Sequence, residues 1–268
     1  MAIKYCSLSS SSVHGNSFLI RGGDGTTIMI DCGIRLRRLE TLLDAVNVTP
    51  CAIAGLFVSH EHVDHTNALR LRKPFAVRHR IPVYAEPTFW RAWAAEQPGE
   101  VPETLRREVS PGETVRVGGL SVRAVAKPHD TQSSVGFVVS DGEERVAVLT
   151  DLGHVNDEIT EAVAGVDHLI FESNHDVEME LASGRPWPLI HRVLGDRGHL
   201  SNEQCLAALL RVAGPRTRTV LLAHLSLDCN DPDLVRRVVG GGLVAAGHRC
   251  ALEIAPPDRP TGWLPRVP

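Results

Sequence analysis

The chain has 268 residues, of which 43% are hydrophobic and only 4% aromatic, and its formal net charge is −4 at pH 7. These values allow one large α/β domain with an aliphatic core, and they exclude a generally basic nucleic-acid-coating protein, although bound cations could still create a local positive site. The six cysteines have no pair spacing, no apolar run approaches about 18 residues, and no charged leader is recognisable, so we expect a cytoplasmic protein without membrane association.

The N-terminal third alternates strands with one helix. Strands are predicted at residues 3–8, 17–20, 26–31 and 56–58, and a helix at 34–46. Asp31 closes the third strand. It is either a turn residue or a carboxylate that bonds a ligand histidine from behind.

Three histidines and an aspartate stand within six residues directly after the strand 56–58. They are His60, His62, Asp64 and His65. Imidazoles packed this closely bury poorly without a partner, whereas a metal ion stabilises neutral histidine and ionised aspartate. The spacing lets the first two meet one ion, while the other two, at the start of a helix, can face a second. A polar turn with incidental histidines is the alternative, but the pattern H-x-H-x-D-H is specific and predicts two divalent ions, Zn or Mn.

A basic run follows this motif. Six residues lie within eleven positions: Arg70, Arg72, Lys73, Arg78, His79 and Arg80. Such a run is usually a solvated face, and the alternative is a phosphate-facing patch beside the metal site. A strand at 82–84, a helix at 87–95 and a charged connection at 96–110 complete this part of the chain.

The remaining chain is again a series of strands and helices. Strands are predicted at 114–117, 120–126, 135–140, 145–150, 166–171, 219–223 and 250–254, and helices at 189–194, 201–212 and 232–239. Ser201 and Gln204 form a capping box at the start of the second of these helices. Residues 1–255 are expected to form a single domain, and residues 256–268, with five prolines, a disordered or surface-laid tail.

Ionisable residues stand at the ends of several predicted strands. His129 lies in the loop after 120–126, Asp151 follows 145–150, and His224 follows 219–223. Strand-end loops are where a scaffold presents functional residues, and these three would complete the ligands of two ions. A layered α/β architecture with its site along one sheet edge is therefore expected.

H-E-H-V-D-H followed by His129, Asp151 and His224 resembles the ligand set of the metallo-β-lactamase family. The resemblance implies a four-layer αββα sandwich with a dinuclear metal site at one sheet edge. It also implies the ligand assignment. The first ion takes His60, His62 and His129, the second takes Asp64, His65 and His224, and Asp151 bridges both.

Two further motifs resemble the ribonuclease Z-like phosphodiesterases. Gly198-His199-Leu200-Ser201 is similar to their G-H-S-T element, which implies that His199 contacts phosphate and protonates the leaving oxygen. His224-Leu225-Ser226 is similar to their H-x-S element, which makes Ser226 a candidate for the site.

Residues 3 to about 250 resemble the WalJ (YycJ) group of bacterial DNA 5′-to-3′ exonucleases, through Gly15-Asn16-Ser17, Ile30-Asp31-Cys32-Gly33 and Glu172-Ser173-Asn174-His175-Asp176. The resemblance implies a metal-dependent phosphodiesterase acting on DNA, at single strands or 5′ ends, with no obligate protein partner. A water between the ions would attack phosphorus, with Asp64 and His199 as catalytic residues. Asn174 and His175 either brace a loop or lie near the cleft.

Three alternatives remain open at this stage. They are a small-molecule phosphodiesterase acting on cyclic phosphates, a thioester hydrolase, and a catalytically silent binding protein. The thioester hydrolase has no evident use for His199, and a silent protein would commonly have lost one of the ligands.

Overall fold

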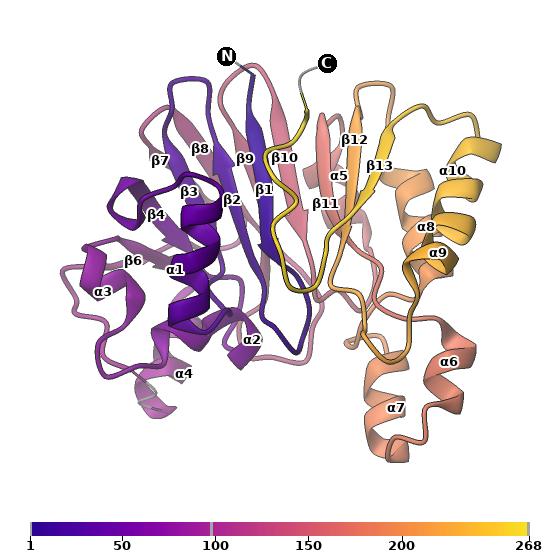
Figure 1. Cartoon of the computed structure of the whole chain (residues 1–268), viewed down its shortest axis with the longest axis horizontal. Helices are drawn as coiled ribbons and strands as arrows, with labels where there is room; N and C mark the ends of the chain where they lie inside the picture. Colours follow the sequence, from indigo (N-terminus) through magenta and orange to yellow (C-terminus); the bar gives the residue numbers. More distant parts are fainter. Residues whose placement is uncertain (1, 97–98, 267–268) are drawn as a thin grey trace.

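Two β-sheets stacked face to face form the centre of the computed structural model, which describes residues 2–96 and 99–266 (Figure 1). The first sheet has the order β1-β2-β3-β4-β5-β6, with antiparallel pairing from β1 to β3 and parallel pairing from β3 onwards. Its strands are β1 (Lys4–Ser9), β2 (Ser17–Arg21), β3 (Thr27–Ile30), β4 (Ile53–Phe57), β5 (Val83–Ala85) and β6 (Arg106–Glu108).

The second sheet has the order β13-β12-β11-β10-β9-β8-β7. It is antiparallel from β7 to β10 and parallel from β10 to β13. Its strands are β7 (Thr114–Val117), β8 (Leu120–Ala126), β9 (Val135–Ser140), β10 (Arg145–Leu149), β11 (His168–Glu172), β12 (Thr219–Ala223) and β13 (Ala251–Ile254).

Helices cover the outer face of each sheet. Outside the first sheet lie α1 (Leu36–Ala45), η1 (Pro50–Ala52), α2 (Val63–Thr66), η2 (Asn67–Leu69), α3 (Phe75–His79) and α4 (Pro87–Glu96). Outside the second lie α5 (Asp157–Val163), α8 (Asn202–Val212), α9 (Pro232–Val235), the π-helical turn η3 (Arg236–Gly240) and α10 (Gly241–Ala245). The helices α6 (Val177–Ala182) and α7 (Trp187–Leu194) project beyond the sheets (Figure 1).

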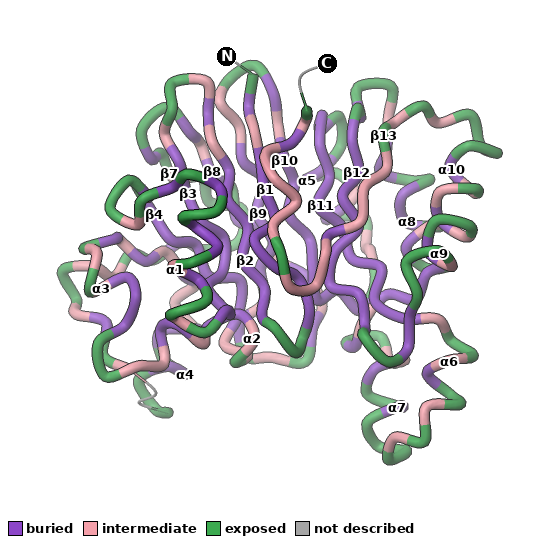
Figure 2. The backbone as a smooth tube through the Cα atoms, in the orientation of Figure 1, coloured by how far each residue is buried: buried purple, intermediate pink, exposed green. Residues whose placement is uncertain are grey.

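Three apolar layers hold these four layers of structure together. One lies between α1, α3, α4 and the first sheet, one between the two sheets, and one between the second sheet and its helices. The strands are therefore buried on both faces over most of their length (Figure 2). This arrangement confirms the predicted αββα sandwich, which belongs to the layered architectures that bury both faces of two sheets.

The C-terminal ends of six strands lie at the same edge of the sandwich. They are the ends of β3, β4, β8, β10, β11 and β12. This is the lower edge in Figure 1, where α2 begins. Every residue predicted to bind metal follows one of these strand ends.

Some elements differ from the sequence predictions. The proline-rich segment is surface-laid as far as Arg266, because the backbone of Leu264 exchanges hydrogen bonds of 2.8 and 2.7 Å with Tyr5 in β1. Residues 267–268 lie outside the described residues. The helix predicted at 232–239 continues to Ala245, and β6, α3, α5 and α6 were not predicted. Within the described residues, no helix has the length and apolarity to cross a bilayer.

Candidate metal centre

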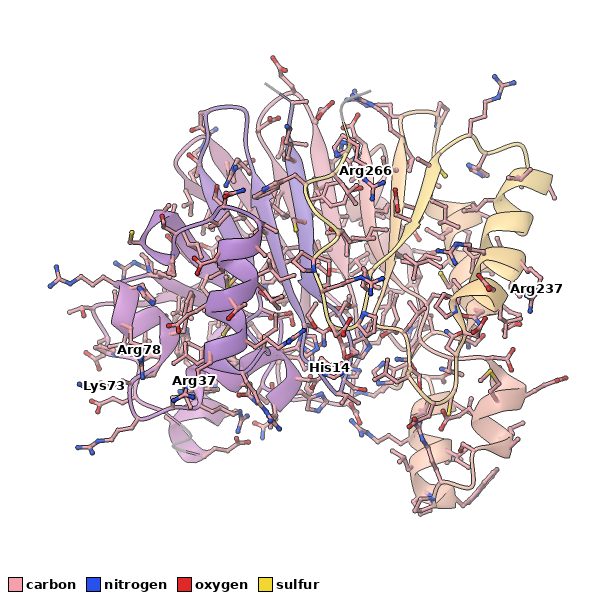
Figure 3. The ribbon with its side chains drawn as sticks, viewed as in Figure 1. His14, Arg37, Lys73, Arg78, Arg237 and Arg266 are labelled. Carbon is pink, nitrogen blue, oxygen red and sulfur yellow. The ribbon has the colours of Figure 1, made fainter. Side chains whose placement is uncertain are left out.

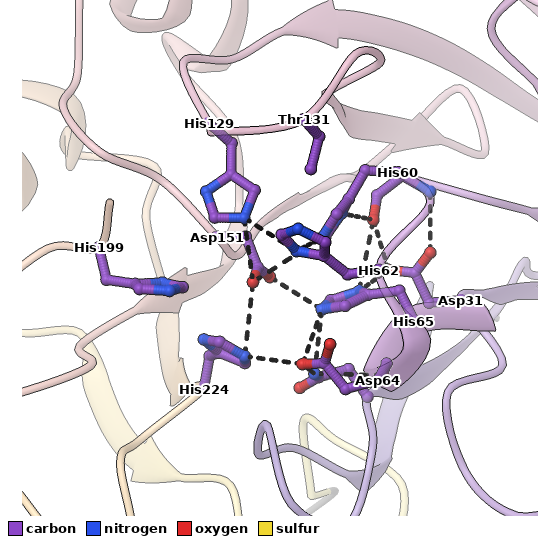
Figure 4. A network of polar contacts seen from close by, with 12 residues as sticks. Asp31, His60, His62, Asp64, His65, His129, Thr131, Asp151, His199 and His224 are labelled. Carbon is purple, nitrogen blue, oxygen red and sulfur yellow. Dashed lines mark hydrogen bonds and ion pairs between the residues drawn. The ribbon is translucent and has the colours of Figure 1, made fainter. Parts of the chain in front are cut away.

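Seven side chains from both sheets meet at the shared edge (Figure 4). The first sheet contributes His60 and His62 from the loop after β4, and Asp64 and His65 from α2. The second contributes His129 after β8, Asp151 after β10 and His224 after β12. The structure thus brings together all seven residues that the sequence marked as ligands.

The first group is a triangle of ring nitrogens. His60 Nε2 lies 3.1 Å from His62 Nδ1, and His129 Nε2 lies 3.3 Å from the same atom. Tetrahedral ligands at zinc–nitrogen bond lengths of 2.0–2.1 Å would stand about 3.3 Å apart. The triangle therefore has the dimensions of three corners of a zinc site.

The protonation states of the first group also suit a cation. His60 Nδ1 lies 2.9 Å from Ser59 Oγ, and His129 Nδ1 donates to the carbonyl of Gly198 at 3.2 Å, which leaves a lone pair on each Nε2. Burial lowers the pKa of His60 well below its usual range and that of His129 to about 3. Neutral histidines are the form that binds metal.

The second group combines carboxylates with histidines. His65 Nε2 lies 3.6 Å from Asp64 Oδ2 and 3.0 Å from Asp151 Oδ2, and His224 Nε2 lies 3.5 Å from both Asp64 Oδ2 and Asp151 Oδ1. Burial alone would lower the pKa of His224, but Asp151 and two further carboxylates raise it to about 10. Without an ion, protons on the histidines balance the carboxylates. A divalent cation would replace those protons, because its ligands bind deprotonated.

Asp151 connects the two groups. Its Oδ1 lies 3.8 Å from His129 Nε2 and 4.0 Å from His60 Nε2, while Oδ2 faces His65. Both oxygens are buried, and Oδ2 makes no hydrogen bond of good geometry with the described residues. An ionised carboxylate that is buried without its full set of donors is costly unless a cation satisfies it. The donor set therefore fits divalent metal.

Strained backbone positions occur at the strand ends that carry the site. Asp31, Asp151 and His224 have φ angles of 58°, 56° and 58°, in the left-handed region that non-glycine residues avoid. Such a conformation costs of the order of 1–3 kcal/mol per residue and persists where the surroundings enforce it. The presence of three such residues at these strand ends indicates that the fold accepts backbone strain to direct their side chains into the site.

Asp31 supports the second group from behind. Its Oδ2 accepts from His65 Nδ1 at 2.8 Å, and the same carboxylate accepts from the backbone N–H and hydroxyl of Ser59, both at 2.8 Å. A carboxylate on Nδ1 fixes the tautomer in which Nε2 faces the metal. Of the two roles predicted for Asp31, this is the carboxylate that bonds a ligand candidate from behind.

Glu172 accepts hydrogen bonds from most of the residues that form the second-sheet half of the site. The sequence analysis did not place it there. The residue is fully buried at the end of β11. Its Oε1 accepts from Asp151 N at 2.9 Å and from the Nδ1 atoms of His199 and His224 at 3.0 Å each. Its Oε2 accepts from the backbone of Leu152 and Leu200 at 3.0 and 2.9 Å. Burial opposes ionisation, but His199 and His224 hold the pKa of Glu172 below its usual range.

His199 lies beside the seven ligand candidates (Figure 4), and with Asp151, Glu172 and His224 it forms a third group of side chains whose donor atoms could meet at one ion. Its ring centroid is 5.2 Å from those of His129 and His224. Because Nδ1 bonds to Glu172, Nε2 is the nitrogen that remains for a ligand. The local sequence explains this position, since the capping box of Ser201 and Gln204 starts α8 immediately after His199.

Two more residues that the sequence analysis did not assign support the ligands. Lys127 is buried and donates from Nζ to the carbonyl of Asp151 at 2.9 Å, and burial lowers its pKa. Asn16 donates from its backbone N–H to the carbonyl of Asp64 at 2.7 Å. Both contacts fix the backbone of a ligand residue.

The remaining candidates lie at or beyond the margin of the site. Asn174 Nδ2 donates to the carbonyl of His224 at 2.7 Å, so it braces a ligand. His175 is buried, and neither ring nitrogen has a partner among the described residues. Ser226 Oγ accepts from Cys229 N at 3.1 Å and so closes a turn. Neither His175 nor Ser226 lines the cavity over the ligands.

That cavity has a volume of about 310 Å³. It is lined by Ser12, His62, Val63, Asp64, Asp151, Arg192, His199 and His224. The guanidinium of Arg192 pairs with Asp130 at its margin. Histidines, carboxylates and one arginine thus face the same small space.

Comparison with known proteins relates this geometry to a family. The β-lactamase superfamily domain matches residues 26–225. The exodeoxyribonuclease YycJ of Bacillus anthracis is 31% identical over 247 residues, which cover 92% of this chain and 91% of that protein. The exodeoxyribonuclease WalJ of Streptococcus pneumoniae is 28% identical over 247 residues, 92% of this chain and 90% of that protein. The metallo-β-lactamase fold protein YhfI from Bacillus subtilis has a TM-score of 0.71 at 15% identity, over 96% of this chain and 98% of that one, and shows the same fold.

Proposed function

Because the chain belongs to the β-lactamase superfamily, and within it to the family of the YycJ and WalJ exodeoxyribonucleases, we propose that this metal-dependent hydrolase is a phosphodiesterase that removes nucleotides from DNA. We further propose that it acts on single strands in the 5′-to-3′ direction and uses two divalent ions, Zn or Mn. The observation that carries the proposal is the pair of ligand groups joined by Asp151, with His199 next to them in one cavity.

When bound, divalent cations at the two groups neutralise charge on a phosphodiester and lower the pKa of water, which supplies the nucleophile. The first group, built from three histidines, suits zinc, and the carboxylates of Asp64 and Asp151 would also accept manganese.

The chain's own residues position the groups that react. Asp64 and Asp151 present carboxylate oxygens to the same space, where they would hold divalent ions. Without those ions, their negative charge would repel an anionic phosphodiester. Glu172 and Asp31 hold the rings of His224 and His65 in the metal-binding tautomer. These contacts preorganise the site before substrate arrives, which is how such sites lower activation barriers.

His199 is the proton donor in this proposal. Its Nδ1 is held by Glu172, and its ring borders the cavity, so Nε2 can deliver a proton to the leaving oxygen. A positioned acid contributes typically 10²–10⁴-fold. We therefore expect His199→Ala to retain its metal content and lose turnover within this range on DNA, but to lose much less on p-nitrophenyl esters, whose leaving group needs little protonation.

The control for this variant is His191→Ala, which removes an exposed histidine from the neighbouring helix α7. An equal loss on good and poor leaving groups, with normal metal content, would make His199 a phosphate-positioning residue. Loss of metal from His199→Ala would instead make it a ligand.

The function itself is tested by a substrate panel on metal-depleted protein reloaded with Zn or Mn. The panel contains bis-p-nitrophenyl phosphate, 5′-phosphorylated single-stranded DNA labelled at either end, RNA, a cyclic phosphodiester and a thioester. The proposal expects stepwise release of nucleotides from the 5′ end of DNA. Preferential turnover of the cyclic phosphodiester or the thioester, with no release from DNA, would refute it.

A further inference from the structure

Exposed cationic side chains gather on the helices outside the first sheet. The basic face, as defined here, consists of Arg35, Arg37, Arg38, Arg72, Lys73, Arg78 and Arg80, and all seven residues are exposed. Residues 35–80 contain eight arginines and lysines and four acidic residues, although the whole chain has 28 and 32. Positive charge is thus concentrated in this segment of an acidic protein.

The two parts of the basic face form one surface. The first three members belong to the start of α1, and the other four flank or belong to α3. The helices are in contact, because His79 Nε2 on α3 lies 3.8 Å from Glu40 Oε1 on α1. Arg37, Lys73 and Arg78 accordingly lie on the same side of the molecule in Figure 3.

The cations of the basic face are not neutralised by neighbours. Within residues 2–96 and 99–266, none of the seven forms an ion pair with a carboxylate. Arg38 donates to the backbone of Asp258 and Arg78 to the backbone of Lys73, which leaves their charge uncompensated. A surface of unpaired guanidinium and ammonium groups is the chemistry that binds phosphate backbones.

The basic face begins at the metal centre. The chain enters α1 through Gly33, whose Cα lies so close to the backbone of Asp64 that an added Cβ would stand 1.5 Å from its carbonyl oxygen. Arg70, between α2 and the second part of the face, donates from Nη2 to the carbonyl of Glu61 at 2.5 Å. Both halves of the face are therefore anchored to the loop and helix that present His62 and Asp64.

We propose that the basic face binds the sugar-phosphate backbone of the nucleic-acid strand whose scissile phosphate lies at the metal centre. This inference rests on the proposed nuclease function and adds the path of the strand. Arginine and lysine on an exposed helical surface contact phosphates without reading bases, so the contact carries affinity and no sequence preference. Because only a long strand can reach both the metal centre and the basic face, the enzyme should bind long strands more tightly than small phosphodiesters.

The test compares two triple variants of equal charge. The face variant, Arg37→Gln/Arg72→Gln/Lys73→Gln, changes side chains that have no hydrogen-bond or ion-pair partner among the described residues. The matched control, Arg116→Gln/Arg123→Gln/Arg237→Gln, removes three exposed cations from β7, β8 and η3. Arg237 lies at the opposite side of the molecule from Arg37 in Figure 3.

Binding of a labelled phosphorothioate single strand of about 30 nucleotides to metal-loaded protein is measured by anisotropy across a salt series. Loss of three phosphate contacts should reduce the slope of log K against log salt by about 2. Raising salt from about 50 to 200 mM should then weaken wild-type binding about 20-fold more than binding by the face variant. The face variant should also raise KM for a long strand and leave turnover of bis-p-nitrophenyl phosphate unchanged, with the control variant behaving as wild type.

Other results would contradict either the role of the basic face or the proposed nuclease function. Equal losses in the face and control variants, or no change in the face variant, would overturn the inference while DNA cleavage by wild-type protein upholds the function. Strand binding through the face without cleavage of any nucleic acid would refute the proposed function and retain the face. Wild-type binding to anionic phosphatidylserine vesicles but not to the strand, lost in the face variant, would assign the face to membranes and overturn the proposal.

Discussion

Glu172→Gln should weaken the second-sheet half of the metal centre, although Glu172 is not one of the seven ligand candidates. The carboxylate accepts five hydrogen bonds, three at Oε1 and two at Oε2, and it is fully buried. Glutamine has the same shape but presents an NH₂ group on one side. Whichever way the amide is turned, at least two buried N–H groups lose their acceptor and face a donor.

The cost follows from those contacts. A buried donor left without an acceptor costs about 1–3 kcal/mol, so the loss in unfolding free energy should be about 2–6 kcal/mol. This is a large share of the roughly 5–15 kcal/mol that stabilises a typical domain. Since the Nδ1–H of His224 also loses its carboxylate, metal affinity should fall about 10–100-fold, as for other supporting carboxylates.

The assay combines unfolding of the metal-free protein in urea, metal titration by calorimetry, and turnover of bis-p-nitrophenyl phosphate. Glu180→Gln is the matched control, because Glu180 on α6 is equally buried but pairs with Arg185 in the connection between α6 and α7. Glu180→Gln should lose stability and keep its metal affinity. Unchanged metal affinity in Glu172→Gln, or an equal loss in both variants, would refute the assigned role of Glu172.

Three further outcomes are expected. EDTA should lower the midpoint of thermal unfolding, because ions held only by the native state stabilise it; an unchanged midpoint after verified metal loss would contradict this. Burial lowers the pKa of His168, with Glu144 opposing, so the unfolded chain binds a proton near pH 6.5 that the native state resists. The free energy of unfolding should therefore fall as pH drops below about 6.5, by up to about 1.4 kcal/mol per pH unit. Measured by urea unfolding, it should depend less steeply on pH in His168→Gln than in wild type. An equally steep dependence in both proteins would exclude His168 as the titrating group. His175→Ala should keep turnover within about twofold, since its ring reaches no described partner; a larger loss with normal metal content would return it to the site.

The convergence of the seven ligand candidates could be predicted from the sequence because it depends on two local features. His60, His62, Asp64 and His65 are adjacent in the chain, and His129, Asp151 and His224 each follow an apolar run. Parallel strands of a layered sheet present their ends at one edge, so residues in these positions meet whatever the loops between them do.

Glu172 was not assigned because its partners are distant in the chain. It is the last residue of a buried strand, and its donors belong to Asp151, Leu152, His199, Leu200 and His224. Nothing local distinguishes it from a carboxylate at a solvated strand end. The feature that could have identified it is the one that identified Asp31, a carboxylate at the end of a strand whose parallel neighbour is followed by a ligand candidate.

The misplaced helix end has a packing cause. Three consecutive glycines, Gly240 to Gly242, indicate the end of a helix. In the structure they continue it, and Gly242 lies so close to α8 that an added Cβ would stand 2.3 Å from a methyl group of Leu206. Here glycine serves close helix packing, which the sequence of one helix does not reveal. The strand β6 was missed for another reason, since its three residues, Arg106–Glu108, carry no alternating apolar pattern.

The two halves of the centre share one construction. In the first sheet, β3 and β4 are parallel neighbours, and Asp31 after β3 bonds Nδ1 of His65, which follows β4. In the second, β11 and β12 are parallel neighbours, and Glu172 at the end of β11 bonds Nδ1 of His224, which follows β12. Each sheet thus supplies a buried carboxylate that orients a ligand candidate from the neighbouring strand.

The two halves differ in the other bonds that this carboxylate makes. Asp31 also accepts hydrogen bonds from the backbone N–H and the hydroxyl of Ser59, whereas Glu172 also accepts one from His199. The carboxylate that orients a ligand candidate in the second sheet therefore also bonds the proposed proton donor, so one side chain holds both histidines in that half.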